Sequence, residues 1–235
     1  MTTTPQTLAL FDLDHTLLPF DSDYQWADFL ARTGRAGDPD AARRRNDDLM
    51  HRYNEGTLSA QEAADFMLGL LKLAPPDELA RWHESYMAEV VHPGILPVAQ
   101  DLVARHRDAG ALCAIVTATN EFVTAPIAHA LGIPHLIATV PERDARGGYT
   151  GRIAGTPSFQ AGKVLRVRAW LQAQGFELEG FGESWFYSDS MNDLPLLEAV
   201  SHPVATNPSP ALRALADTRG WCVLDLFEDM RDTKS

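Results

Sequence analysis

Short apolar runs alternate with helix-forming segments along this chain, and this alternation is the feature that most restricts its fold. Parallel strands are buried on both faces and are joined by crossover helices, so the pattern favours an α/β fold with a mostly parallel sheet. The runs that we predict to be strands are Thr7–Phe11, Ala111–Val116, Pro134–Ala138, Ser184–Tyr187, Pro203–Ala205 and Trp221–Leu224.

The stretch from about Ser22 to about Val91 contains no strand-like run and is predicted to be helical. It lies directly after the first strand, at the carboxyl edge of the sheet, where open α/β sheets bind their ligands. We therefore expect two units. Residues 1–20 and 93–235 would form a Rossmann-like α/β core, and residues 21–92 would form an inserted, all-helical cap domain.

Local signals mark where the cap helices begin and end. Asp21 or Ser22 can cap the first helix, and Ser59 with Glu62 three positions later has the spacing of a capping box. The tripeptide 92–94, His-Pro-Gly, is predicted to break the helical pattern.

Two further features concern the core. Residues 139–152, with adjacent glycines at 147 and 148, are predicted to form a hairpin within the core. Cys113 and Cys222 each lie in a short apolar run and are predicted to be small buried residues rather than disulfide partners.

The charge balance restricts the partners of the protein. The sequence has 20 Lys and Arg against 32 Asp and Glu, a formal net charge of −12. Such a field repels nucleic acid and anionic membranes, so neither is an expected partner. Residues 1–7 lack the features of a secretory signal and no long apolar run is present, which predicts a soluble cytoplasmic protein. The same composition predicts no particular oligomeric state.

The first strand runs directly into two carboxylates, Asp12 and Asp14, separated by one residue. In extended backbone their side chains point the same way, roughly 7 Å apart. On its own this arrangement also fits a helix cap or a solvated turn. His15 is predicted to be an exposed turn residue.

A second acidic cluster follows the strand near residue 187, where Asp189, Asn192 and Asp193 stand close together. Carboxylates gathered at strand ends raise one another's pKa and favour a bound cation. Mg²⁺ is coordinated by carboxylate and carbonyl oxygens, so we predict a Mg²⁺ site at this edge.

Two other segments fit phosphate chemistry. Residues 117–120, Thr-Ala-Thr-Asn, are predicted to end a strand and offer hydroxyl and N–H groups at the start of a helix. Lys163 lies near the start of a later helix. Taken alone, Thr117 fits a plain turn and Lys163 a surface charge. Together with the acids they form a set suited to phosphoryl transfer to or from a small phosphorylated metabolite.

The chain resembles the haloacid dehalogenase superfamily of aspartate-nucleophile phosphatases. The resemblance covers nearly the whole chain and rests on four motifs in order: Asp12-x-Asp14-x-Thr16, then Thr117, Lys163, and Ser188-Asp189-Ser190-x-Asn192-Asp193. The cap position is similar to that of subfamily IB, the branch with a C1-type cap that contains phosphoserine phosphatase.

The resemblance implies a role for each matching residue. Asp12 would be the nucleophile and a Mg²⁺ ligand. Asp14 would be the general acid/base and would offer its backbone carbonyl to Mg²⁺. Asp189 would be a third metal ligand, supported by Asp193.

It also implies how the phosphoryl group is held. Thr117 and Ala118 would bind this group, and Lys163 would neutralise the negative charge of this group and of Asp12. Asn192 matches the family's asparagine on the substrate side.

Departures from the family pattern concern the substrate. Phosphoserine phosphatases hold the amino acid with a flap glutamate and a cap arginine. Here the flap position is Asp21, and the matching cap stretch, residues 66–71, has no arginine. Ala118 and Thr119 replace the glycines of the third motif. These differences disfavour phosphoserine.

The longer stretches around these motifs, residues 11–23, 117–128 and 187–198, are more similar to a bacterial subgroup that includes histidinol-phosphate phosphatases. Asp21 and Asp23 could pair with the ammonium group of an amino alcohol phosphate, and we predict histidinol phosphate as the substrate. Capping of the first cap helix is an equally good account of Asp21. The alternatives are a phosphatase for phosphoserine or another small metabolite, a phosphotransferase of the same fold, and a non-catalytic regulatory protein.

Overall fold

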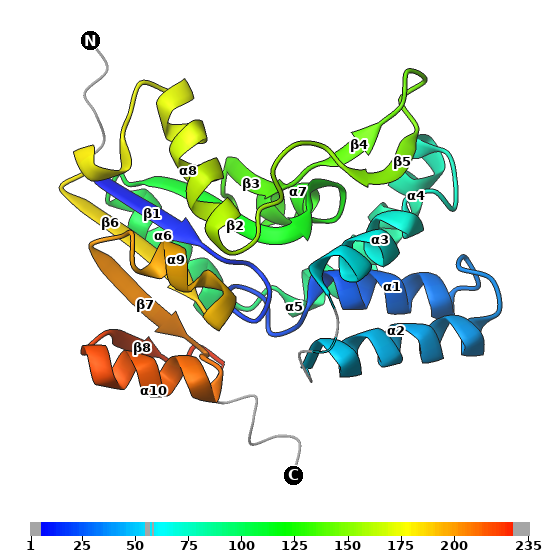
Figure 1. The fold of residues 1–235 in the computed structure, drawn as a ribbon, viewed down its shortest axis with the longest axis horizontal. Helices are drawn as coiled ribbons and strands as arrows, with labels where there is room; N and C mark the ends of the chain where they lie inside the picture. The colour runs from blue at the N-terminus through cyan, green and yellow to red at the C-terminus, as the bar shows by residue number, and fades with distance from the viewer. Residues whose placement is uncertain (1–5, 55–56, 58, 228–235) are drawn as a thin grey trace.

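The computed structural model describes residues 6–54, 57 and 59–227. Its centre is a six-stranded sheet in which every neighbouring pair is parallel (Figure 1). The strand order is β3-β2-β1-β6-β7-β8. The strands are β1 (Thr7–Phe11), β2 (Leu112–Asn120), β3 (His135–Thr139), β6 (Glu183–Ser188), β7 (His202–Thr206) and β8 (Cys222–Leu224). The predicted Rossmann-like fold class is confirmed.

Helices cover both faces of the sheet. Alternate residues of β1 point to opposite faces: Ala9 and Phe11 join one buried cluster, and Leu8 and Leu10 join the other. The helices against the first face are α6 (Pro97–Asp108) and α7 (Glu121–Ala130), and those against the second are α8 (Ala161–Ala173), α9 (Leu194–Leu197) and α10 (Pro210–Arg219).

The strand order determines where a ligand can reach the sheet. The chain leaves β1 toward β2 on one side and later returns to pair β6 on its other side. The carboxyl ends of these three strands therefore lie together at a topological switch point, where α/β sheets bind ligands.

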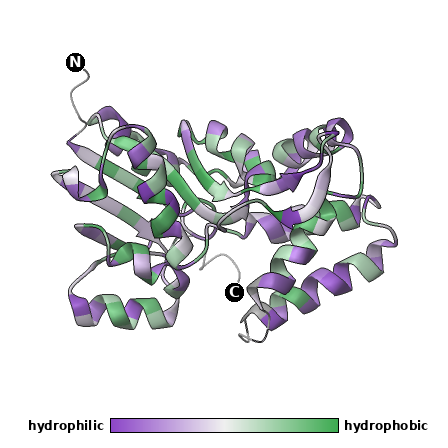
Figure 2. Ribbon diagram, turned by 45° about the horizontal axis from the view of Figure 1, so that its top comes forward, coloured by the Kyte–Doolittle hydropathy of each residue, from purple (hydrophilic) through white to green (hydrophobic). Residues whose placement is uncertain are grey.

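The predicted helical insertion is also present. It consists of α1 (Ser22–Arg32), α2 (Pro39–Asn54), α3 (Ala60–Leu70), α4 (Pro76–Tyr86), a π-helix (Met87–Val91) and α5 (His92–Gly94). None of the described residues between 22 and 91 is in a strand. Figure 2 shows that hydrophilic residues predominate along α2, on the outside of this helical segment.

One predicted boundary is wrong. The tripeptide 92–94 does not break the helix but forms α5, which continues from the π-helix. Pro93 lies inside this continuous helical path, directly after the π-helix, and it has no N–H to donate to the preceding turn. The helical path ends one residue later, at Ile95, whose backbone is extended.

The predicted caps are confirmed. The Asp21 carboxylate accepts a hydrogen bond from the Tyr24 backbone N–H at 2.7 Å, which caps α1. Ser59 and Glu62 form the capping box of α3. Asp21 therefore has a structural role whatever else it contacts.

The helical segment and the sheet share one continuous hydrophobic cluster. Trp26 and Tyr86 of the helical segment belong to the same buried cluster as Phe11 of β1. At the junction, the ring of Phe122 on α7 packs against Trp26 and His83, with centroid distances of 5.8 and 5.2 Å. Nε2 of His83 donates a hydrogen bond to the Val123 carbonyl at 2.9 Å. The pKa of His83 falls to about 4 because the ring is buried, so this histidine is neutral.

The predicted hairpin forms, but it does not join the core sheet. It is a separate antiparallel pair, β4 (Pro141–Arg143) and β5 (Tyr149–Ile153), and β5 packs against helix α3 (Figure 1). The backbone of β5 lies close to Lys72 at Gly151, which has φ of 82°. A Cβ at this position would lie 2.8 Å from the side chain of Lys72.

The prediction for the cysteines is half right. Cys113 is buried in β2, whereas Cys222 is exposed because it opens β8, the edge strand of the sheet.

Within the described part of the chain, no helix has both the length and the apolar character needed to cross a membrane.

Candidate active site

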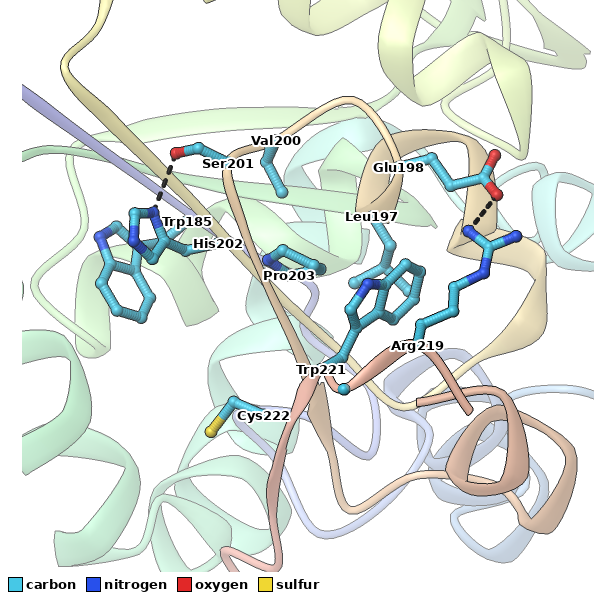
Figure 3. Close-up of a pocket in the computed structure, with 11 residues that line it drawn as sticks. Trp185, Leu197, Glu198, Val200, Ser201, His202, Pro203, Arg219, Trp221 and Cys222 are labelled. Atoms are coloured by element: carbon cyan, nitrogen blue, oxygen red, sulfur yellow. Dashed lines mark hydrogen bonds and ion pairs between the residues drawn. The ribbon is translucent and has the colours of Figure 1, made fainter. Parts of the chain in front are cut away.

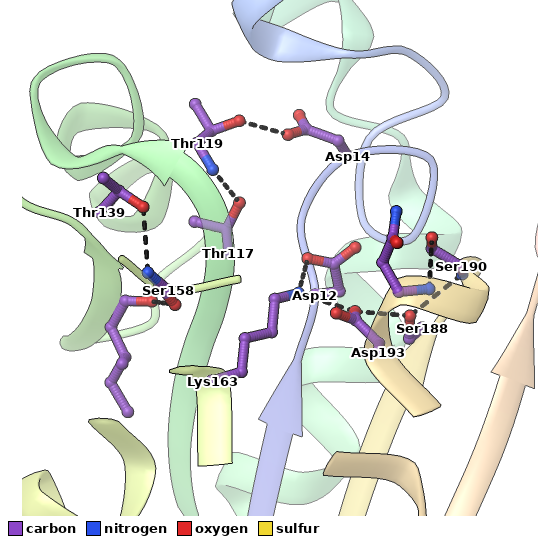
Figure 4. Close-up of polar contacts among 12 residues, drawn as sticks. Asp12, Asp14, Thr117, Thr119, Thr139, Ser158, Lys163, Ser188, Ser190 and Asp193 are labelled. Carbon is purple, nitrogen blue, oxygen red and sulfur yellow. Dashed lines mark hydrogen bonds and ion pairs between the residues drawn. The ribbon is translucent and has the colours of Figure 1, made fainter. Parts of the chain in front are cut away.

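Asp12 stands at the carboxyl end of β1, where its backbone N–H continues the ladder by donating to the Tyr187 carbonyl at 2.9 Å. Nζ of Lys163 lies 2.9 Å from Oδ1 of Asp12 and 2.7 Å from Oδ2 of Asp193 (Figure 4). All three residues are buried. The structure therefore brings together three of the predicted site residues in one charged cluster.

Lys163 projects from the first turn of α8 and is only 2% exposed, so it is not a surface charge. Burial alone would lower its pKa, but the attraction of Asp12 and Asp193 more than offsets this and raises it. The lysine is held as an ammonium ion between the two carboxylates.

Asp14 is fixed by two hydrogen bonds from different parts of the chain. Oδ1 accepts from the Ser22 backbone N–H at 2.7 Å, at the start of α1, and Oδ2 accepts from the Thr119 hydroxyl at 2.8 Å. Burial raises the pKa of Asp14 to about 6 and the nearby Asp21 adds to the rise, while these hydrogen bonds limit it. A carboxyl group with this pKa can both give and take a proton near neutral pH.

Residues 117–120 end a strand at the start of a helix, as predicted, since β2 ends at Asn120 and the side chain of Asn120 caps α7. The strand is longer than predicted, because it continues past Val116. Thr117 is buried and its hydroxyl accepts a hydrogen bond from the Thr119 N–H at 3.2 Å, whereas Ala118 is exposed. β2 extends through these residues because it still pairs with β3 at Asn120. The register of this pairing shifts between Val116 and Asn120.

The loop after β6 carries the second acidic cluster. Asp193 is buried and also accepts from the Ser188 hydroxyl at 2.7 Å. Asp189 is half-buried, and its pKa rises to about 7 because of burial and the nearby Asp193 carboxylate. Asn192 is half-buried and its Oδ1 accepts from the Gln160 side chain at 3.3 Å.

The predicted Mg²⁺ ligands fit a magnesium ion by their chemistry. Among the described residues, no three side chains of His, Cys, Asp or Glu form a metal-binding group. The predicted set needs only two carboxylates and one carbonyl, which suits an ion that usually keeps several waters. Lys163 faces the carboxylates of both Asp12 and Asp193. Burial raises the pKa of Asp12, Lys163 opposes this rise, and the nearby carboxylates of Asp193, Asp189 and Asp14 add to it. This excess of negative charge favours a bound cation.

Asp21 and Asp23 lie beside Asp14 at the start of α1. Both are half-buried, and burial raises the pKa of each. Oδ1 of Asp23 accepts from the Asn120 side chain at 3.1 Å, which joins helix α1 to the end of β2. Three carboxylates therefore crowd one corner of the site.

A surface cavity of about 660 Å³ lies elsewhere, at the amino ends of β6, β7 and β8 (Figure 3). Its lining includes Trp185, His202 and Trp221, and an ion pair between Arg219 and Glu198. None of the predicted site residues lines it. The chemistry is concentrated at the opposite edge of the sheet.

Sequence reasoning missed several residues of the site. Thr119 and Ser22 hold Asp14, and Ser188 holds Asp193. Thr119 carried a signal, because it stands where the family has glycine. The backbone N–H of Ser22 carried none, since any residue could supply it.

Residues 9–198 match the family described as haloacid dehalogenase-like hydrolase. A histidinol-phosphatase from Neisseria meningitidis serogroup C (strain 8013) is 40% identical over 220 residues, which are 94% of this chain and 99% of that protein.

Two solved structures are similar. A protein of unknown function from Bordetella pertussis Tohama I is 66% identical, with a TM-score of 0.92 over 95% of this chain and 100% of that chain. A substrate-bound phosphoserine phosphatase is 18% identical, with a TM-score of 0.66 over 97% and 98% of the two chains, and shares the fold. The family match covers most of the sequence. This chain therefore belongs to the haloacid dehalogenase-like hydrolases, as a phosphatase of that family.

Proposed function

We propose that the protein is a Mg²⁺-dependent phosphomonoester hydrolase that forms an aspartyl-phosphate on Asp12. The observation that carries the proposal is the buried Asp12–Lys163 pair at the switch point of the sheet, beside an Asp14 whose pKa is about 6. The pairing uses one carboxylate oxygen of Asp12. The Lys163 ammonium favours the ionised side chain that a nucleophile needs, and it opposes burial and the nearby carboxylates, which raise the pKa of Asp12.

In the first step a carboxylate oxygen of Asp12 attacks phosphorus, and the bond from phosphorus to the alcohol oxygen breaks. Asp14 gives its proton to the leaving alkoxide. Lys163 stabilises the negative charge shared by the phosphoryl group and Asp12. Thr117 and Ala118 would hold the phosphoryl oxygens, and Asn192 would face the substrate.

In the second step water attacks the aspartyl-phosphate, Asp14 accepts the proton, and Asp12 is released with inorganic phosphate. The residues that would hold Mg²⁺ are Asp12, Asp189 and the backbone carbonyl of Asp14, with Asp193 in support. When bound, the ion would supply positive charge to the phosphoryl oxygens.

We assign residues 21–92 as the cap domain and residues 1–20 with 93–235 as the core. The cap contacts the catalytic residues directly, because the Ser22 N–H binds Asp14 and the Tyr86 hydroxyl donates to the Ser22 carbonyl at 3.0 Å. Such contacts favour a cap that excludes water from the site during the reaction.

For the substrate we propose histidinol phosphate. Asp21 and Asp23 place negative charge next to Asp14, and burial raises the pKa of both, so an ammonium group would be a favourable neighbour. A relative that is 40% identical over nearly its full length is named a histidinol-phosphatase, which supports the same choice.

Phosphoserine fits less well. Residues 66–71 contain no arginine, and Leu68, Leu70 and Leu71 are buried in the hydrophobic cluster. The carboxylate of phosphoserine would therefore enter an acidic corner with no cation from this segment. Leaving a charged group without its partner typically costs at least about 1.4 kcal/mol, or tenfold in affinity.

Steady-state hydrolysis tests the proposal. We expect phosphate release from histidinol phosphate with a kcat/KM at least about tenfold above that for phosphoserine. Activity should be lost with a chelator and restored by Mg²⁺. Equal or reversed preference would refute the substrate assignment, and activity that survives chelation would refute the metal requirement.

A charge-removing variant of Asp21 separates recognition from helix capping. Asparagine is as good an N-cap as aspartate, so Asp21→Asn keeps α1 capped. We expect lower kcat/KM for histidinol phosphate and little change for p-nitrophenyl phosphate, which has no ammonium group. Equal effects on both substrates would show that Asp21 does not recognise the ammonium.

A further inference from the structure

The loop after β7 lies against the loops that follow β1 and β6, which carry Asp14 and Asp189. Asn207 follows this strand in the left-handed region, with φ of 46°. Its backbone N–H donates to the Leu224 carbonyl at 2.7 Å, which ties it to the end of β8. The backbone of Asn207 is therefore anchored on the side away from the catalytic residues.

The side chain of Asn207 joins two separate segments. Nδ2 donates to the backbone carbonyl of His15 at 2.8 Å, and Oδ1 accepts from the backbone N–H of Phe227 at 3.0 Å. One amide thus connects the residue after Asp14 to the segment that follows β8.

His15 is a residue whose backbone needs such support. Its side chain is exposed, as predicted, but its φ is 56°, which is unfavourable for a residue with a Cβ. Its N–H donates to the Phe20 carbonyl at 3.3 Å and its carbonyl accepts from Asn207. Because His15 follows Asp14 directly, its conformation sets the direction of the peptide group that Asp14 presents.

The same loop contacts the second acidic cluster. The backbone N–H of Ser209 donates to the carbonyl of Asp189 at 2.9 Å, and Ser209 caps α10. Asn207 and Ser209, two residues apart, therefore contact the loops that carry Asp14 and Asp189.

We propose that Asn207 is a positioning residue, which holds the His15 carbonyl and so keeps Asp14 in its reactive place. This inference rests on the proposed role of Asp14 in phosphomonoester hydrolysis. Asparagine suits the position on three counts: it tolerates positive φ, it donates to His15, and it accepts from Phe227.

Two variants separate positioning from general support. Asn207→Asp tolerates the left-handed backbone and can still accept from Phe227, but it cannot donate to His15. Asn207→Gly also tolerates this backbone, loses both side-chain contacts and adds no charge. A loss common to both variants is therefore due to the missing donor rather than to added charge.

Ser201→Ala is the matched control for stability. The Ser201 hydroxyl accepts from the Ser184 N–H at 2.8 Å, at the amino end of β7 and so at the edge of the sheet away from Asp14. Its loss removes a side-chain contact to backbone, as the Asn207 variants do, without touching a catalytic loop.

We would measure kcat and KM with p-nitrophenyl phosphate, thermal unfolding, and hydrogen exchange of peptides covering residues 13–20. We expect both Asn207 variants to lose about 10- to 100-fold in kcat, with KM changed by less than about threefold, and to exchange faster in residues 13–20. Ser201→Ala should lower the melting temperature and leave kcat and this exchange unchanged.

The outcomes are distinguishable. Wild-type kcat in Asn207→Asp, or unchanged exchange of residues 13–20 in both Asn207 variants, would overturn the positioning role. An equal fall in kcat in Ser201→Ala would do the same, since stability alone would then account for the loss. If the wild-type protein hydrolyses no phosphomonoester, the proposed function fails, and the exchange data still decide whether Asn207 holds this loop.

Discussion

Replacing Asp189 with asparagine should make the metal-free protein more stable. Asp189 is half-buried near Asp193, and its pKa rises from 3.8 to about 7. At pH above 7 the folded protein must keep this side chain ionised in an unfavourable place. Asparagine has a similar shape and no charge, so Asp189→Asn removes the penalty.

The sign and size follow from proton linkage. A folded-state pKa above the unfolded value means that the folded protein binds the proton more tightly, so stability is full at low pH and falls as pH rises from about 4 to about 7. A rise of about 3 units corresponds to about 4 kcal/mol at 1.36 kcal/mol per unit. Solvent contact reduces this, and we expect a gain of about 1–3 kcal/mol, or about 2–10 °C in Tm.

Thermal unfolding in chelator at pH 5 and pH 8 measures the effect. Asp189→Asn should unfold several degrees higher than wild type at pH 8. At pH 5 its advantage should be less than half as large, because the penalty develops between about pH 4 and about pH 7. Addition of Mg²⁺ at pH 8 should stabilise the wild-type protein by occupying its site, and should stabilise the variant much less. Asp101→Asn on the exposed surface of α6 is the control for net charge, and it should change none of these values.

Two results would refute this reasoning. An Asp189→Asn protein no more stable than wild type at pH 8 would show that the carboxylate is not destabilising. A gain of the same size at pH 5 and pH 8 would show that ionisation is not its cause. Equal stabilisation of both proteins by Mg²⁺ would instead remove Asp189 from the metal site.

Three further predictions concern catalysis. Asp12→Asn should lower p-nitrophenyl phosphate hydrolysis by roughly three orders of magnitude or more, with an unchanged circular dichroism spectrum, because the nucleophile is lost. Thr119→Val removes a hydrogen bond that favours ionised Asp14, so the pKa of Asp14 should rise above about 6 and the fall of kcat/KM at high pH should move upward, as a pH profile would show. Lys163→Met should abolish activity and lower the free energy of unfolding by about 3–5 kcal/mol in urea titrations, because it leaves Asp12 and Asp193 buried without their cation.

Most of the fold could be predicted because its signals are local. Each strand of the sheet is a short apolar run, and the predicted strand near Thr7–Phe11 has the bounds of β1. The end of β2 could not be predicted, since residues 117–120 are polar by sequence and their place in the sheet depends on β3. The break predicted at 92–94 came too early, because the helical path continues from the π-helix through Pro93 and ends at Ile95.

The contacts of the site depend on residues far apart in the sequence. Lys163 binds Asp12 across 151 positions, and Asn207 binds His15 across 192. No periodicity within either segment reports such a contact. The motif resemblance placed Lys163 in the site. Asn207 belongs to none of the motifs, and its contact with His15 depends on the pairing of β7 with β6, which the sequence does not specify.

The charges around Asp12 and those at the start of α1 differ, and this difference bears on which substrate the site would accept. A chain with net charge −12 must attract a phosphate dianion locally, and Lys163, the lysine buried beside Asp12, already faces two carboxylates. In the proposed mechanism, the added positive charge for the dianion would come from Mg²⁺ at the ends of β1 and β6. At the start of α1, beside Asp14, the excess of carboxylate has no such ion and suits a cationic group. A small metabolite with phosphate at one end and ammonium at the other would match both regions at once, whereas a second carboxylate would be repelled from the α1 side.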